Sequence, residues 1–167
     1  MGATTCNDVI ETLRSGELAE WRGWPLGCGL SDLEAAIDLE SGVTNTVSGK
    51  ERLPTSHRAA AVDGLGEPLY VWFRGASLVK ASLQYPTIKD VAALLAALGE
   101  PPLKLDTYFS SVPTVNRGGE WVYPTRGLTL FMSSDKSNVV AVSLFPPTTE
   151  ERYRAELYNF EPPREHP

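Results

Sequence analysis

The chain has 167 residues, of which 15 are Lys or Arg and 21 are Asp or Glu, so its formal net charge is −6. With 42% hydrophobic and 22% charged residues, the composition is that of a globular protein with one domain or two small units. The acidic balance, without a basic run, argues against nucleic acid or an anionic membrane as partner. The N-terminal residues lack the basic and apolar regions of an export signal, so we expect a cytoplasmic protein.

Four segments have the pattern of helices. Residues 7–20 place Val9, Ile10 and Leu13 on one face, and Gly16 weakens or ends that helix. The other three begin with Ser or Thr three residues before a carboxylate, the spacing of a capping box. These starts lie at residues 31–34, 87–90 and 148–151. The second of these helices should end at Gly99, because prolines follow it.

Strand patterns alternate with these helices. The strongest lie at residues 69–73 and 78–85, joined by a hairpin-length turn, and at residues 128–132 and 139–145. Weaker strands are expected at residues 44–48, 56–62, 104–110 and 120–123. Residues 113–119 have the composition of an exposed loop, and residues 161–167 that of a flexible polar tail.

The two strong hairpins and the helices beside them form an internal repeat. Residues 69–73, a turn, residues 78–83 and a Pro-Thr pair align with residues 128–132, a turn, residues 139–144 and a second Pro-Thr pair. The offset grows from 58 to 61 residues along the chain, as insertions in loops would produce. The repeat divides the chain into units at 1–86 and 87–160, although chance similarity between short apolar strands remains the alternative explanation.

One stretch of the second unit has a familiar layout. A helix is followed by Gly99-Glu100-Pro101, then by the strand Trp121-Val122-Tyr123 and two apolar strands. This layout resembles the repeat of the beta-lactamase-inhibitory-protein-like fold. The resemblance implies an α+β protein of two tandem helix-plus-antiparallel-meander units, with the helices packed on one face of a continuous sheet. It also implies that the concave face of the sheet grips a target protein.

The cysteines depart from that family. Its secreted inhibitors carry a disulfide within each unit, whereas both cysteines of this chain, Cys6 and Cys28, precede residue 30. Without an export signal, we expect these two thiols to be reduced and buried.

Alternation along the first hairpin separates an apolar face from a mixed one. Leu69, Val71 and Phe73 fall on one side, whereas Tyr70 and Trp72 fall on the other. Large aromatic residues among polar ones are typical of protein interfaces, unless another part of the chain covers them. The partner-binding residues predicted on this basis are Tyr70, Trp72, Lys80, Gln84, Phe131, Phe145 and, at the rim, Arg126.

The sequence therefore predicts a non-enzymatic protein-binding protein, most concretely an immunity or inhibitor protein that blocks a toxin or enzyme. No metal site or cofactor is expected, the partner should have a basic surface, and the oligomeric state stays open. One alternative is a small-molecule-binding protein with a pocket lined by Trp21, Trp24 and Trp72. A second is an enzyme in which His57 acts with Ser56 and Asp63, although no Gly-x-Ser-x-Gly motif is present.

Overall fold

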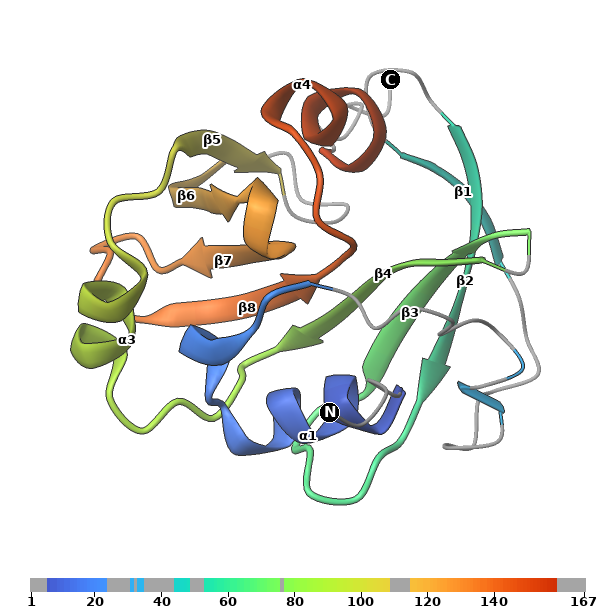
Figure 1. The fold of residues 1–167 in the computed structure, drawn as a ribbon, viewed down its shortest axis with the longest axis horizontal. Helices are drawn as coiled ribbons and strands as arrows, with labels where there is room; N and C mark the ends of the chain where they lie inside the picture. The colour runs from blue at the N-terminus through green and yellow to red at the C-terminus, as the bar shows by residue number, and fades with distance from the viewer. Residues whose placement is uncertain are drawn as a thin grey trace, which may run out of the picture.

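The computed structural model describes residues 6–23, 31, 33–34, 44–48, 53–75, 77–108 and 115–158. These residues form an eight-stranded antiparallel sheet with the strand order β1-β2-β3-β4-β8-β7-β6-β5 (Figure 1). The strands are β1 Thr44–Ser48, β2 Leu53–Ala60, β3 Leu69–Arg74, β4 Ser77–Gln84, β5 Leu103–Tyr108, β6 Val115–Tyr123, β7 Leu128–Met132 and β8 Val139–Leu144. Two successive four-stranded meanders are thus joined along β4 and β8, and the expected α+β class is confirmed.

Short helices surround this sheet. They are α1 Cys6–Ser15, the 3-10 turns η1 Leu18–Glu20 and η2 Pro124–Arg126, α3 Val91–Leu98, α4 Glu150–Arg152 and its π-helical continuation η3 Tyr153–Leu157. Ser31, Leu33 and Glu34 are also helical, as the first capping pattern predicts. In Figure 1, α1 lies near β3 in the lower part of the view and α4 at the top, near β5.

The start of α3 differs from the predicted one. The carboxylate of Asp90 caps this helix by accepting a hydrogen bond of 3.0 Å from the amide of Ala93. The sequence pattern placed the cap at Thr87, three residues earlier. Asp90 satisfies the exposed N–H groups directly before the apolar run, so the helix needs no earlier residue. The predicted end is confirmed, because Gly99 follows the last helical residue with φ of +77°.

The larger hydrophobic core lies on one face of the sheet, here called the α1 face. Leu69, Val71 and Phe73 of β3 point into it, and the cross-strand register continues it through β4, β8 and β7. Helix α1 covers this face with Val9, Ile10 and Leu13, which are each at most 4% exposed. Burial of each of these three side chains contributes about 1.5–3 kcal/mol.

The opposite face, here called the α4 face, has a smaller core over the second meander. Tyr153 and Tyr158 pack there with Leu103, Val122 and Phe145. The expectation that the helices pack on one face is therefore not confirmed. Since Val122 and Phe145 are apolar and point away from the α1 face, they need a cover of their own, and α4 with η3 supplies it.

Strand β6 corrects the expected loop at residues 113–119. It begins at Val115, and both Gly118 and Gly119 are buried within it. A Cβ atom on Gly118 would lie 2.1 Å from the carbonyl oxygen of Met132 in β7. Strands β6 and β7 therefore approach this closely only because residue 118 is glycine. The glycines that resembled a loop signal are thus a packing requirement of a strand, whereas residues 113–114 lie outside the described residues.

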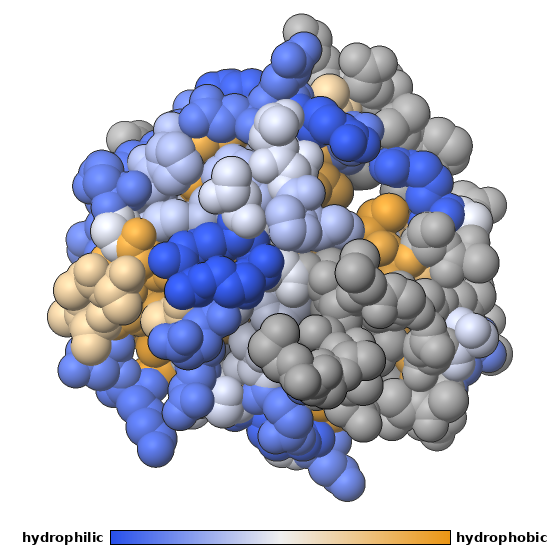
Figure 2. All heavy atoms as spheres, viewed as in Figure 1, coloured by the Kyte–Doolittle hydropathy of each residue, from blue (hydrophilic) through white to orange (hydrophobic). Residues whose placement is uncertain are grey.

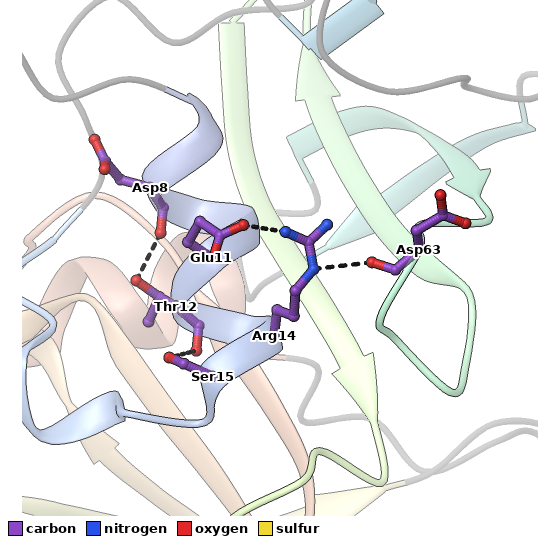
Figure 3. A network of polar contacts seen from close by, with 6 residues as sticks. All are labelled: Asp8, Glu11, Thr12, Arg14, Ser15 and Asp63. Carbon is purple, nitrogen blue, oxygen red and sulfur yellow. Dashed lines mark hydrogen bonds and ion pairs between the residues drawn. The ribbon is translucent and has the colours of Figure 1, made fainter.

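Helix α1 is also fixed by polar contacts (Figure 3). Arg14 forms an ion pair with Glu11, and its Nε donates a hydrogen bond of 2.9 Å to the carbonyl oxygen of Asp63. Asp63 lies in the connection between β2 and β3, so this bond joins the N-terminal helix to the first meander. The helix ends at Ser15, and Gly16 follows with φ of +72°, as predicted for that glycine.

Figure 2 shows the surface from the same side as Figure 1. Hydrophilic residues cover most of the described surface in this view, and a pale apolar patch lies over α3. The exposed alanines Ala92, Ala93, Ala96 and Ala97 belong to this helix. Their side chains are small, so the patch is weakly apolar.

Candidate functional site

Two aromatic side chains and a lysine form a row on the α4 face of the first meander. The register pairs Tyr70 with Ser82 and Trp72 with Lys80, which places all four on one face. The ring centroids of Tyr70 and Trp72 are 6.4 Å apart, and Lys80 Nζ lies 4.3 Å from the centroid of the Trp72 ring. We call Tyr70, Trp72 and Lys80 the aromatic strip. All three are half-buried, so part of each remains open to contact.

A polar row continues from the strip across the seam between the two meanders. Ser82 of β4 and Ser143 of β8 share a hydrogen bond of 2.6 Å between their hydroxyl oxygens. Thr129 of β7 lies opposite Ser143 and donates a hydrogen bond of 2.9 Å to the hydroxyl of Tyr153. That hydroxyl in turn donates one of 2.6 Å to Glu120. The row thus leads from the half-buried aromatic strip to a buried carboxylate.

Burial shifts the pKa values of the ionisable groups near the two ends of this row. Burial lowers the pKa of Lys80, and the negative charge of Glu120 opposes that shift. Burial also raises the pKa of Tyr153 well above its usual value, and the charge of Glu120 adds to the effect. Tyr153 is therefore a neutral hydrogen-bond donor, and it stabilises the Glu120 carboxylate, which is 5% exposed.

Six of the seven predicted binding residues lie on the α4 face, and five of them keep some exposure. Phe131 lies opposite Ala141 in the second meander and is half-buried, like the aromatic strip. Gln84, at the end of β4, is exposed. The predicted separation of Tyr70 and Trp72 from Leu69, Val71 and Phe73 is confirmed by the alternating burial along β3.

The other two predicted residues, Phe145 and Arg126, have different surroundings. Phe145 is fully buried, with its ring centroid 5.3 Å from that of Tyr153, because α4 and η3 fold back over it. Arg126 donates a hydrogen bond of 2.9 Å to the carbonyl oxygen of Ala19, so it anchors η1. The prediction that Phe145 contributes to an exposed interface is corrected, because this residue belongs to the core. Arg126 keeps some exposure, so its place at the rim stays a prediction.

The aromatic pocket of the alternative hypothesis does not form. Trp21 is 5% exposed, belongs to the core on the α1 face and donates a hydrogen bond of 2.9 Å to the carbonyl oxygen of Gly127. Trp72 lies on the α4 face, so the sheet separates the two indole rings. Trp24 lies outside the described residues.

The residues of the other hypotheses are only partly described. In β2, Ser56 pairs with Phe73 and His57 with Trp72, so the two occupy opposite faces of the sheet. Asp63 lies beyond the end of that strand, where its carbonyl oxygen binds Arg14. The side chains of Ser56, His57 and Cys6 are outside what the structure describes, as is all of Cys28.

Sequence reasoning missed Glu120 and Tyr153. The alternation of residues 120–123 does place Glu120 on the same face as Val122, but a lone carboxylate at a strand end is usually exposed. Tyr153 lies in the helix whose start the sequence predicts at residues 148–151, and that capping pattern gives no sign of a buried hydroxyl. The two residues are 33 positions apart in the sequence, and a local pattern does not predict contacts over that separation.

Comparison with known proteins gives no match to a family model, a curated protein or a solved structure. No helix among the described residues is long and apolar enough to cross a membrane. Within that same part of the chain, no three His, Cys, Asp or Glu residues gather into a potential metal site.

Proposed function

We propose that this chain is a non-enzymatic protein-binding protein that uses the α4 face of its first meander, in the manner of a cytoplasmic immunity or inhibitor protein. The observation that carries the proposal is the aromatic strip. Tyr70 and Trp72 are large, half-open and fixed on a sheet, so they supply contact area with little loss of conformational entropy.

The charges around the strip add to this argument. Lys80 packs on Trp72, which restrains both side chains before a partner arrives. The chain as a whole has a net charge of −6, and this favours a partner with a basic surface, such as a nuclease toxin.

The sheet topology supports the related proposal that residues 1–86 and 87–160 are tandem copies of one unit. The sequence repeat aligns Ser82 with Ser143, and these two residues lie directly opposite each other in the β4–β8 pair. Ala81 pairs with Leu144 and Leu83 with Val142, so a twofold rotation about the serine pair exchanges the two flanking pairs. This arrangement supports the beta-lactamase-inhibitory-protein-like plan as a working hypothesis.

The proposal is tested by affinity capture from lysate of the native host with three baits. These are the wild type, Tyr70→Ala/Trp72→Ala, and Tyr85→Ala, which removes an aromatic side chain that is 68% exposed outside the strip. We expect one protein in stoichiometric amount on the wild type and on Tyr85→Ala, and its loss from the double variant. Equal capture by all three folded baits, or no stoichiometric protein on any, would contradict the proposal.

A further inference from the structure

Arg74, the last residue of β3, carries two hydrogen-bond donors that have no partner among the described residues. Its Nε and Nη2 atoms are both buried, and neither makes a hydrogen bond within the part of the chain that the structure describes. A buried donor that has lost water and gained no acceptor costs about 1–3 kcal/mol, and more for a charged group. A guanidinium left in this state is unusual enough to need an explanation.

The two orphan donors lie on one edge of the guanidinium. Nε–H and the adjacent N–H of Nη2 point in the same direction, and their spacing matches the two oxygens of a carboxylate. Such a fork accepts both oxygens at once, whereas an ammonium group offers a single point charge. The unpaired atoms are thus one complete recognition edge.

The surroundings of Arg74 strengthen this reading. Burial alternates along β3, so Arg74 shares the α4 face with Tyr70 and Trp72. Trp72 lies two residues before Arg74, and Lys80 stacks on its ring. Lys80 and Arg74 thus lie on the same face of the sheet as this indole, in a chain whose net charge is −6. An anion at the Arg74 fork would gain from the guanidinium charge, and the half-buried setting favours one negative charge over two.

We propose that the Arg74 end of the aromatic strip is a carboxylate-binding site, in which Nε and Nη2 bind both oxygens of one carboxylate. The inference shares its location with the proposed function, yet it depends only on the fork. The carboxylate comes either from an acidic side chain of a bound protein or from a small carboxylic acid. Both nitrogens are shielded from solvent, so a ligand must first displace the protein atoms around them. That displacement takes time, and each titration is therefore followed to equilibrium.

The test is an NMR titration of the whole chain, with the Arg74 Nε–H and Trp72 indole N–H signals as reporters. The probes are succinate, a blocked Gly-Glu-Gly peptide, its Gly-Gln-Gly counterpart, inorganic phosphate and sodium chloride at matched ionic strength. We expect the Arg74 signal to shift and saturate with succinate or with the Glu peptide, but not with the Gln peptide or chloride. Saturation by succinate indicates that a small acid suffices, and saturation by the peptide alone indicates a protein side chain.

Two variants sharpen the result. Arg74→Met keeps the length of the side chain without its donors, so its melting temperature should equal or exceed that of the free wild type, while carboxylate binding is lost. At a probe concentration of 100 times Kd, the wild type should gain about 5–10 °C and Arg74→Met nothing. Arg74→Lys keeps the charge without the fork and should bind at least about tenfold more weakly.

The inference is overturned if neither carboxylate probe gives a saturable shift, or if phosphate binds and carboxylates do not. It is also overturned if Arg74→Met melts well below the wild type, because its donors would then be satisfied. None of these outcomes decides whether Tyr70 and Trp72 contact a protein partner, which the capture experiment tests separately.

Discussion

At the scale of single residues, Gly127 fixes how the second meander meets the N-terminal segment. Its φ is +67°, and a Cβ atom there would lie 1.9 Å from the carbonyl oxygen of Phe145. The carbonyl oxygen of Gly127 also accepts hydrogen bonds from the amide of Phe145 and the indole of Trp21. One backbone position therefore joins β8, η2 and the end of η1.

Gly127→Ala should consequently destabilise the protein by more than the strain of the left-handed backbone conformation would alone. Gly75→Ala is the matched control, because Gly75 has a φ of +63° but no atom within 4 Å of the added Cβ. We expect Gly75→Ala to lower the free energy of unfolding by about 1–2 kcal/mol, and Gly127→Ala to lower it by at least about 2 kcal/mol more. Urea unfolding measures both, and equal losses would contradict the close contact.

The buried pair of Tyr153 and Glu120 makes a second prediction. Tyr153→Phe removes the donor that stabilises Glu120, so we expect the free energy of unfolding at neutral pH to fall by about 1–3 kcal/mol. Tyr85→Phe, at an exposed hydroxyl, should change it by less than about 0.5 kcal/mol.

The pH dependence of this pair has a definite sign. Because the pKa of Tyr153 is higher in the folded protein than in the unfolded chain, its contribution is whole below pH of about 10 and is lost as the pH rises toward the folded value. The wild type should therefore lose stability above about pH 10 more steeply than Tyr153→Phe does. Urea unfolding at pH 9 to 11 gives the free energy of unfolding of both proteins. If the two free energies fall in parallel with pH, the result would argue that the phenol is not buried.

At the scale of secondary-structure elements, α3 is a test of where a helix begins. Asp90→Ala removes the cap on the amide of Ala93 and should cost about 1 kcal/mol. Thr87→Ala, at the cap that the sequence pattern favours, should cost clearly less, because Thr87 lies outside the helix. Thermal unfolding of the two variants compares them directly, and the reverse order would move the helix start to Thr87.

The connection between β7 and β8 depends on Asp135. Its carboxylate accepts hydrogen bonds of 2.7 Å from the hydroxyls of Ser137 and Ser133 and one of 3.0 Å from the Ser137 amide. These bonds, led by the Ser137 hydroxyl, lower the pKa of Asp135 to about 2.

Because the folded pKa is the lower one, the stabilisation by Asp135 is present above the unfolded value of 3.8 and is lost as the pH falls toward about 2. The difference in unfolding free energy between the wild type and Asp135→Asn should therefore shrink between pH 4 and pH 2. A difference that stays constant over this range, measured by urea unfolding, would rule out a carboxylate held by the two serines.

The elements that local patterns predict well are those with strong alternation or a flanking glycine. Strand β7 and the joined pair β3–β4 follow from their β-branched and aromatic residues, and α3 ends at its glycine. Strand β6 was predicted too short, because Gly118 and Gly119 are also typical of loops. Their role depends on the close approach of β7, which is a contact between strands that a local pattern does not contain.

At the scale of the whole molecule, the two meanders share one core. The cluster on the α1 face includes Leu69 and Val71 from the first meander and Leu130 and Leu144 from the second. The β4–β8 pair carries the sheet from one meander to the other, so the α4 face is also continuous. The strand order is compatible with the predicted repeat, which stays a prediction. The cover that α4 and η3 supply over the second meander depends on packing that the sequence pattern does not specify.

This asymmetry determines which part of the α4 face is available. Over the second meander, Tyr153 and Phe145 form a core, so the predicted interface residue Phe145 is buried. Over the first, Tyr70, Trp72 and Lys80 remain half-buried and form the candidate site. Five of the seven predicted residues lie on the α4 face and keep some exposure, because strand alternation specifies a face. Phe145 lies on this face but is covered, because alternation says nothing of what packs over a face. Arg126 lies outside the strands, in η2, where it keeps some exposure.

The most direct measurement is the affinity of the captured partner for three purified proteins, by isothermal titration calorimetry. These are the wild type, Tyr70→Ala/Trp72→Ala and Tyr85→Ala, each checked for folding by circular dichroism. If the aromatic strip is the contact, the double variant should bind at least about 30-fold more weakly, whereas Tyr85→Ala should stay within about twofold of the wild type. A double variant that is folded and binds as tightly as the wild type would contradict the account.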